Sequence, residues 1–421
     1  MKIRTLLACV AMAVECSITT SSALAGGADL SRLVVVGDSL SAGYQNGSLL
    51  GTQQPHGYAN LVAAQAGVEL PLPLIAAPGI PPVLQLVATT PLPIVVPAPG
   101  TSTGRIDPLV QAMNLAVPGA TVGAALRDRP DFPIDDLSDI VLGLPGLLSG
   151  VSRSQVEWAE ALAPTTVIAW IGSMDALGAL LVGDASAITP VADFERDYAE
   201  LVDRLAATGA TLVVANIPDV TAIPYLVPAA AVAGAIGLPL DAAAAVLGIG
   251  PDDFVTLDAF PAIQDILFGV TPRPLDPRYV LDPGDIQAIR SATAAFNAII
   301  AANADRVGAA VVDVHGLFER LRVEGLVVNG QRLHVGYLGG LFSLDGIHPT
   351  NTGYAVLANE FIHALDTAFA ATVPPLAVVE VADVDPLVLP DVGRPAGLGH
   401  VHAQAGRWQR AVLSGKAESS R

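Results

Sequence analysis

The sequence predicts an α/β fold in which a parallel β-sheet lies between layers of helices. Short apolar runs alternate along the chain with segments of helical spacing, and this alternation is typical of parallel sheets. The runs are continuously apolar, as expected for strands that are buried on both faces. The strand-like runs lie at residues 33–37, 166–172, 211–216 and 309–314, and helical spacing is clearest at residues 191–208 and 285–304.

The composition indicates a large apolar core and an acidic surface. Of the 421 residues, 52% are hydrophobic and 14% are charged, and the formal net charge is −19. A chain of this length exceeds the usual size of one compact core, so we expect one domain with large insertions over residues 26–372. The excess of acidic side chains argues against nucleic acid as a partner.

The first 25 residues have the features of a secretory signal peptide. Two basic residues precede an apolar run at residues 6–14, and the small side chains that follow fit cleavage after Ala25. We therefore expect a secreted protein, or one of the periplasm or cell envelope. Cys9 and Cys16 would leave with the signal, so the mature chain would contain no disulfide.

Two insertions and a tail depart from the alternation of strands and helices. Residues 68–108 are rich in proline and predict an irregular surface excursion. Residues 217–283 are apolar, but their prolines and glycines would break a transmembrane helix. We interpret this insertion as a lid beside the site, or alternatively as an extra helical layer. An Asn-Gly pair predicts a hairpin over residues 327–335, and residues 373–421 resemble an extended tail.

Ser39 follows the first predicted strand directly, in the run Gly-Asp-Ser. Functional side chains of open parallel sheets gather at the carboxyl ends of the strands. On this run alone, however, a cap for the next helix is the preferred interpretation of Ser39. Three more polar segments punctuate the chain, namely NLAVPGAT at residues 114–121, GSMD at residues 172–175 and DGIHPT at residues 345–350.

The last of these segments offers a base for Ser39. An aspartate three residues before a histidine in a tight loop can hold one ring nitrogen, which leaves the other nitrogen to accept a proton from a hydroxyl. Asp345 and His348 have this spacing. The sequence therefore pairs Ser39 with a candidate base.

In this order, the four segments resemble the successive blocks of the SGNH (GDSL-type) esterase and lipase family, and NIPDV at residues 216–220 extends the match. The resemblance covers residue 33 to about residue 369. It implies a flavodoxin-like fold of three layers, with the parallel sheet between helices. It also implies hydrolysis of carboxylic acyl esters through a serine acyl-enzyme, with no cofactor and no metal.

The resemblance also implies a role for each matching residue. Ser39 would be the nucleophile, His348 the general base and then acid, and Asp345 the group that orients and stabilises the imidazolium. The backbone N–H groups of Ser39 and Gly119 would bind the oxyanion, a role that needs only amides directed at one point. Gly119 suits this role because it has no side chain to obstruct the substrate.

Position 174 departs from the family pattern. The third block of the family is G-x-N-D, and its asparagine donates a side-chain N–H to the oxyanion, whereas this chain has Met174. A thioether cannot donate a hydrogen bond. Loss of one such donor costs roughly a hundred- to a thousandfold in rate. Ser173 would compensate if its hydroxyl reached the oxyanion.

Three functions from different classes therefore remain open. The leading prediction is a secreted esterase or lipase that acts on a small-molecule or lipid-like ester. The second is a deacetylase of envelope carbohydrates, although the aromatic content of 5% argues against a long polysaccharide cleft. The third is a catalytically weakened relative that binds lipid or another envelope partner, for which Met174 is the argument.

The remaining polar residues have structural interpretations. Asp38 is expected to be a hydrogen-bonding group beside Ser39, and Asp175 is expected to cap or brace the helix that follows it. His400 and His402 form His-Val-His in the tail, but no carboxylate or cysteine lies at ligand spacing. We therefore predict no metal site.

Overall fold

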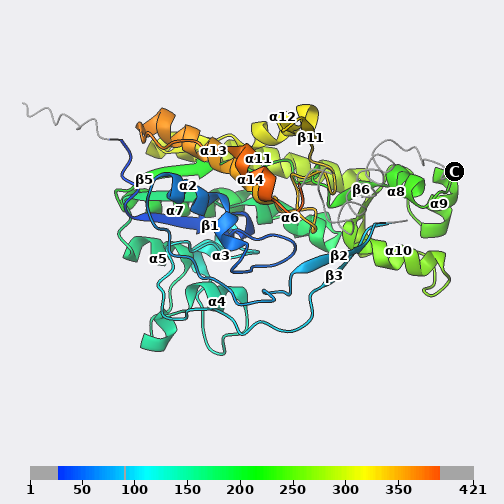
Figure 1. Cartoon of the computed structure of the whole chain (residues 1–421), viewed down its shortest axis with the longest axis horizontal. Coiled ribbons are helices and arrows are strands. Elements are labelled where there is room, and N and C mark those ends of the chain that lie inside the picture. The colour runs from blue at the N-terminus through cyan, green and yellow to red at the C-terminus, as the bar shows by residue number, and fades with distance from the viewer. Residues whose placement is uncertain (1–26, 90–91, 389–421) are drawn as a thin grey trace, which may run out of the picture.

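The computed structural model describes residues 27–89 and 92–388. Its centre is a parallel sheet of four strands in the order β1-β4-β5-β9 (Figure 1). Each strand lies within one of the predicted strand-like runs, so the predicted α/β class is confirmed. The strands are β1 (Leu33–Gly37), β4 (Thr166–Trp170), β5 (Thr211–Ala215) and β9 (Ala310–Val312). The predicted signal peptide and the pair His400 and His402 lie outside the described residues.

Side chains of the sheet alternate between two buried cores. Val34 and Val36 of β1 face one core, and Leu33 and Val35 face the other. This alternation follows from the twofold period of a strand and explains why the runs are apolar throughout. Helices α3 (Val122–Arg127), α5 (Gln155–Ala161), α6 (Ser173–Val182), α7 (Val191–Ala207) and α11 (Pro283–Val307) contribute to the first core, and α2 (Tyr58–Gln65), α12 (Val314–Glu324) and α13 (Asn351–Phe369) contribute to the second.

The proline-rich insertion contains regular structure that the sequence analysis missed. Strands β2 (Leu84–Ala88) and β3 (Ile94–Pro97) pair antiparallel. Their side chains are at most half-buried, so the runs carry no strong apolar signal, and prolines flank both strands. The expectation of an irregular excursion over residues 68–108 was therefore wrong for this part. Helix α4 (Leu137–Leu142) follows later in the chain, before α5.

The second insertion forms a small unit with its own apolar core at one end of the molecule (Figure 1). Strands β6 (Leu226–Pro228), β7 (Phe254–Thr256) and β8 (Val280–Leu281) form an antiparallel sheet, and helices α8 (Ala229–Ala235), α9 (Leu240–Leu247) and α10 (Phe260–Leu267) pack on it. Across the described residues, no single helix has the length and apolarity to cross a membrane. The pair α8 and α9 would pass together, but the chain bends by 101° between them.

The predicted hairpin is confirmed, and the predicted tail is partly wrong. Strands β10 (Leu326–Val328) and β11 (Gln331–Leu333) pair through Asn329 and Gly330, both with positive φ. Beyond α13, the described part of the tail folds back and includes helix α14 (Val378–Val384). Asp385 is buried there and accepts hydrogen bonds from the backbone N–H and the hydroxyl of Thr352. Residues 373–388 therefore belong to the folded domain, because their apolar side chains pack on α13 and on β10.

Candidate active site

Ser39 is the first residue of the short helix α1 (Ser39–Ala42), which begins where β1 ends. The helix cap is Asp38, whose Oδ1 accepts a hydrogen bond from the N–H of Leu40 at 3.0 Å. Ser39 is therefore not the cap, and its hydroxyl is available for other contacts. Its backbone N–H lies in the first turn of a helix, where amides have no intrahelical partner.

The structure brings Ser39, His348 and Asp345 into one hydrogen-bonded chain. His348 Nε2 lies 2.7 Å from Ser39 Oγ, and His348 Nδ1 lies 2.9 Å from Asp345 Oδ2. All three side chains are buried or nearly so. A neutral imidazole that donates from Nδ1 to the carboxylate has a free lone pair at Nε2. The arrangement can therefore remove a proton from the serine hydroxyl.

Asp345 is held by hydrogen bonds from several directions. Its Oδ1 accepts from the backbone N–H groups of Ile347 and His348, both at 2.9 Å, and from the Ser343 hydroxyl at 3.1 Å. Its Oδ2 accepts from the N–H of Gly47 at 2.8 Å as well as from His348. Burial alone would raise the pKa of Asp345, but the imidazole and these donors outweigh burial and lower its pKa.

The loop after α1 braces the histidine loop, and the sequence analysis missed this role. Asn46 Oδ1 accepts a hydrogen bond from the N–H of Leu344, and the N–H of Asn46 donates to the Ser343 hydroxyl. The ring of Tyr44 lies against the imidazole of His348, with the ring centres 4.7 Å apart. The Asn-Gly pair at positions 46 and 47, which marks a tight turn, was the available sequence signal.

Gly119 reaches the site along the edge of β1. The segment before it runs beside β1, since the N–H of Leu115 donates to the carbonyl of Val35 and the N–H of Val117 donates to that of Gly37. Gly119 has a φ of +87°, and a Cβ at this position would project into open space. Gly119 and Ser39 both line the second hollow described below.

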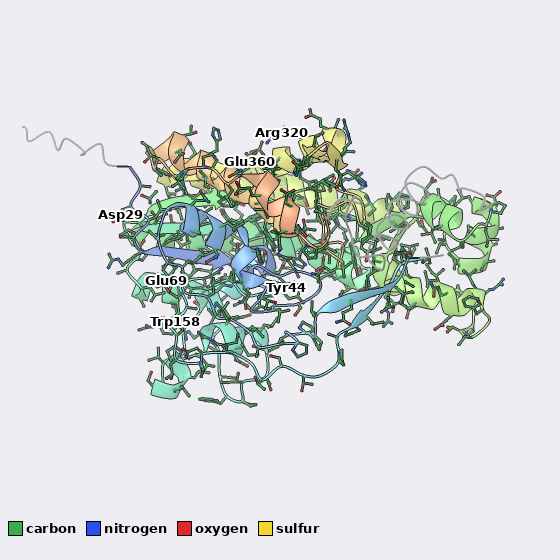
Figure 2. All side chains as sticks on the ribbon, in the orientation of Figure 1. Asp29, Tyr44, Glu69, Trp158, Arg320 and Glu360 are labelled. Atoms are coloured by element: carbon green, nitrogen blue, oxygen red, sulfur yellow. The ribbon has the colours of Figure 1, made fainter. Side chains whose placement is uncertain are left out.

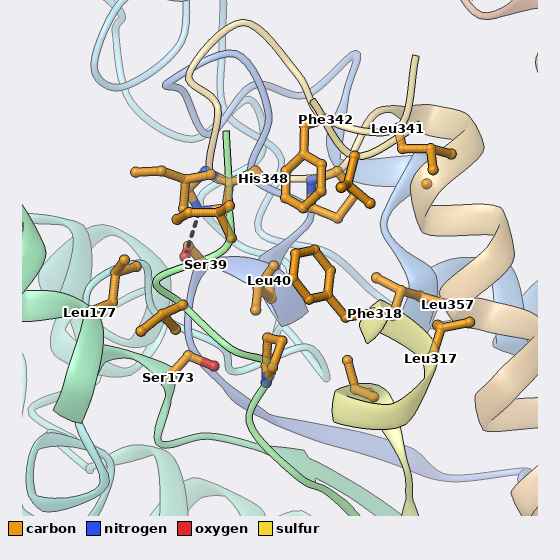
Figure 3. Close-up of a pocket in the computed structure, with 18 of the residues that line it drawn as sticks. Ser39, Leu40, Ser173, Leu177, Leu317, Phe318, Leu341, Phe342, His348 and Leu357 are labelled. Carbon is orange, nitrogen blue, oxygen red and sulfur yellow. Dashed lines mark hydrogen bonds between the residues drawn. The ribbon is translucent and has the colours of Figure 1, made fainter. Parts of the chain in front are cut away.

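The first turn of α6 borders the site on another side. Met174 lines both of the hollows that Ser39 lines. The Ser173 hydroxyl is buried, has no hydrogen-bond partner among the described residues, and points into the apolar cavity rather than at Ser39 (Figure 3). Asp175 lies in the first turn of α6 and accepts a hydrogen bond from the N–H of Val122 at 3.0 Å. It therefore connects α6 to the start of α3.

Two buried carboxyls near Ser39 have raised pKa values. Burial raises the pKa of Asp38 to about 7, and the hydrogen bond from Leu40 and the charge of His348 offset only part of this effect. Burial likewise raises the pKa of Asp175 to about 6. These values fit the structural roles that the sequence predicted for both aspartates. In the described chain, no group of three metal-binding side chains is close enough to hold an ion.

An apolar cavity opens from the Ser39–His348 pair toward helices α12 and α13 (Figure 3). Its volume is about 80 Å³. Leu317, Phe318 and Leu321 of α12 and Leu357 of α13 form its far wall. Arg320 of α12 and Glu360 of α13 form an ion pair at 3.2 Å on the outer surface of this wall (Figure 2).

A second hollow, the cleft, meets the cavity at Ser39, Met174 and His348. It is larger, with a volume of about 420 Å³, and Gly119 lines it. Both insertions line it, through Leu84 and Val95 of the β2–β3 hairpin and through residues 257–260. Helices α8 and α9 line neither hollow. Pro218, Val220 and Ile223 of the second insertion also line the apolar cavity. Parts of this insertion therefore form walls of both hollows, while α8 and α9 lie away from the site.

A family model described as GDSL-like Lipase/Acylhydrolase matches residues 33–361. The chain belongs to this family. The resemblance that we drew from four sequence blocks is thus confirmed, and the chain is assigned to the acyl hydrolases. The match extends from β1 to α13 and includes both insertions, Ser39, Gly119 and His348. No curated protein matches the sequence.

Several solved structures are similar to this chain at low identity. They include the esterase EstA from Pseudoalteromonas sp. (14% identity, TM-score 0.34, covering 80% of this chain and 97% of that one). They also include an extracellular lipase from Streptomyces rimosus (17%, 0.33, 80% and 98%) and phospholipase A1 from Streptomyces albidoflavus (14%, 0.32, 80% and 98%). These TM-scores are too low to support an inference about substrate.

Proposed function

We propose that this protein is a carboxylic ester hydrolase that cleaves acyl esters through a covalent acyl-enzyme on Ser39. The observation that carries the proposal is the hydrogen-bonded chain from Ser39 Oγ through His348 to Asp345, placed at the mouth of an apolar cavity. Family membership supports an acyl hydrolase. An activated serine can attack the carbonyl carbon of an ester, which is consistent with the ester class.

The proposed reaction consists of acylation of Ser39 followed by deacylation. His348 Nε2 accepts the proton of Ser39 as Oγ bonds to the ester carbonyl carbon, and the oxyanion accepts hydrogen bonds from the N–H groups of Ser39 and Gly119. Asp345 stabilises the imidazolium because its low pKa keeps it ionised. His348 then gives the proton to the departing alcohol, and during deacylation water replaces the alcohol and releases the acid.

A lipid-like ester is the substrate class that the apolar cavity favours. Each methylene that leaves water for such a cavity gains about 0.8 kcal/mol, so a long acyl chain would bind better than acetyl. A carbohydrate deacetylase, our second alternative, would leave most of the cavity empty. The third alternative, a weakened relative that binds lipid, rests on Met174 and differs from the first in the rate of turnover.

Labelling by a fluorophosphonate probe tests the nucleophile without knowledge of the substrate. The mature protein should react with the probe, and Ser39→Ala should not. Ser41→Ala is a matched control, because Ser41 is also buried on α1 but its hydroxyl bonds to Tyr58 and not to His348. Equal labelling of the wild type and Ser39→Ala would remove the assignment of Ser39.

Rates on p-nitrophenyl esters of increasing acyl length separate the functional alternatives. An esterase or lipase should show a kcat/KM that rises with acyl length, whereas a deacetylase should fall off sharply beyond acetyl. Labelling without turnover on any ester would favour the weakened relative.

Export from the cytoplasm is part of the proposal and rests on the first 25 residues alone. N-terminal sequencing of the protein recovered from the medium or envelope should start at Gly26. Recovery of the full-length chain in the cytoplasm would contradict export.

A further inference from the structure

The two hollows that meet at Ser39 differ in polarity, and this difference bears on how an ester would lie between them. Apart from Ser39 and His348, the cavity presents the side chains of Asp38 and Ser173 as polar groups, and both are at least 97% buried. The cleft presents Tyr44, Tyr225 and the exposed carboxylate of Asp258. The cavity is therefore the less polar of the two hollows, and the cleft carries an exposed charge that water can solvate.

Deacylation decides which half of the ester each hollow can take. After the alcohol departs, a water molecule must occupy its position beside His348 Nε2 and attack the acyl carbon. The acyl chain stays bound during this step. The less polar cavity suits the half that stays, and the more polar cleft suits the half that leaves and is replaced by water.

The cleft nevertheless has large apolar walls. One wall comes from the hairpin, where Leu84 and Val95 line the cleft. The opposite wall comes from the second insertion, where Leu257 and Phe260 line it. A small or fully polar alcohol would leave these side chains without contact, so the walls favour an alcohol group that is itself apolar.

The charge at the cleft favours a neutral alcohol. Asp258 is exposed there and accepts a hydrogen bond from the Tyr225 hydroxyl at 2.8 Å. The chain as a whole carries a net charge of −19. An anionic alcohol group would be repelled both locally and by the overall field.

We propose that the substrates of this enzyme are neutral esters that are apolar on both sides of the ester bond, with the acyl chain in the α12–α13 cavity and the alcohol chain in the cleft built by the two insertions. This assignment rests on the proposed ester hydrolase function. It adds that the β2–β3 hairpin, with Leu257 and Phe260 of the second insertion, determines specificity for the alcohol, while α12 and α13 determine specificity for the acid.

A pair of isomeric esters tests the assignment. Hexyl acetate carries its long chain on the alcohol side, and ethyl hexanoate carries it on the acyl side, so overall hydrophobicity is matched. For the wild type, kcat/KM for each isomer should exceed that for ethyl acetate. The ratio of kcat/KM for hexyl acetate to that for ethyl acetate then measures the contribution of the cleft. The same ratio for ethyl hexanoate measures the contribution of the cavity.

Filling each hollow with a larger side chain should remove one preference. Val95→Trp should lower the preference for hexyl acetate by roughly ten- to two-hundredfold, depending on how many of its four extra methylenes lose apolar contact, and leave the preference for ethyl hexanoate in place. Leu321→Trp should lower the preference for ethyl hexanoate and leave the preference for hexyl acetate in place. Leu84→Trp is a second cleft variant that keeps the test decisive if Val95→Trp does not fold.

The chain offers a matched control for each variant. Val96 follows Val95 on β3 but does not line the cleft, and Val323 lies on α12 two residues after Leu321 with its side chain exposed. Val96→Trp and Val323→Trp should keep both wild-type preferences.

Several results would overturn the proposal. In the first, Val95→Trp lowers the preference for ethyl hexanoate and Leu321→Trp lowers that for hexyl acetate. In the second, either variant lowers both preferences equally. In the third, both variants keep the wild-type preferences. A wild type that prefers ethyl acetate to hexyl acetate would also overturn it. Failure of the ester hydrolase function would look different, since the wild type would hydrolyse none of the three esters and would not react with the fluorophosphonate probe.

Discussion

Ser39 lies between two segments of different polarity, the loop of residues 343–350 and the first turn of α6 (Figure 3). In the loop, Asp345 accepts hydrogen bonds from four residues and His348 is bonded on both ring nitrogens. In the first turn of α6, Met174 replaces the family asparagine and the Ser173 hydroxyl is buried without a partner among the described residues. In the proposed mechanism, proton transfer therefore has a complete set of side chains, whereas stabilisation of the oxyanion would depend on backbone amides.

The comparison teaches that the two tasks of a serine hydrolase can be maintained independently. Proton transfer needs a fixed imidazole, and the hydrogen bonds around Asp345 fix it. Oxyanion stabilisation is a sum over donors, so loss of one donor lowers the rate without removing the reaction. The predictions below test each side of Ser39 in turn.

The largest effect is expected for Asp345→Asn. An asparagine here would favour the wrong tautomer of His348 and could not stabilise the imidazolium, so kcat should fall on the order of 10⁴-fold. Steady-state rates on a p-nitrophenyl ester measure this, with circular dichroism to show that the fold persists. A loss below roughly tenfold would mean that Asp345 does not act through His348.

Met174→Asn should raise activity. If the new amide donates to the oxyanion, kcat should rise with little change in KM, because the donor binds the transition state better than the ground state. The gain should not exceed the roughly hundred- to thousandfold that one donor provides. Met174→Leu is the matched control and should leave kcat near the wild-type value. An unchanged or lower kcat in a folded Met174→Asn would show that position 174 does not face the oxyanion.

Ser173→Ala should have a small effect, within about threefold on kcat for an acetyl ester, because its hydroxyl points into the cavity and away from Ser39. Comparison with Met174→Asn in single and double variants measures any coupling between the two positions. A large loss in Ser173→Ala that disappears in the Met174→Asn background would identify Ser173 as the substitute donor.

The smallest effect concerns the pH dependence of stability, and it tests the raised pKa of Asp38. Burial raises the pKa of Asp38 from 3.8 to about 7, so the folded protein keeps its proton where the unfolded chain has lost it. The stabilising effect is complete below pH 3.8 and is lost as the pH rises to about 7. An asparagine does not titrate, so the Tm of Asp38→Asn minus that of the wild type should rise between pH 3.8 and about pH 7. Above this range the difference should be constant.

Asp175→Asn provides a control for this measurement. The pKa of Asp175 is raised to about 6, so the same gain in Tm should level off about one pH unit earlier. A difference in Tm between Asp38→Asn and wild type that is constant with pH would contradict a raised pKa for Asp38.

The parts that could be predicted from sequence are those specified by neighbouring residues. The run Leu33–Gly37 is apolar throughout, and only a strand buried on both faces explains this. The spacing of Asp345 and His348 anticipated their hydrogen bond because three residues of a tight loop fix their geometry. The distance between Ser39 and His348, by contrast, was inferred from the order of family blocks.

The parts that could not be predicted depend on contacts between distant segments. The β2–β3 hairpin has at most half-buried strands, so it lacks the apolar alternation that marks most strands. Leu317 and Leu321 of α12 have the spacing of any amphipathic helix, and nothing local indicates that they line a cavity with Ser39. The brace from Asn46 to Leu344 joins segments about 300 residues apart.

The contact of Asp385 with Thr352 has a consequence for the order in which the protein matures. Thr352 lies in the first turn of α13, four residues after His348, and its backbone N–H is held by a carboxylate that is synthesised 33 residues later. A ribosome that has just completed α13 therefore carries a chain in which the histidine loop still lacks this support. The histidine loop gains this support only after the residues up to Asp385 have been made and have folded back onto α13.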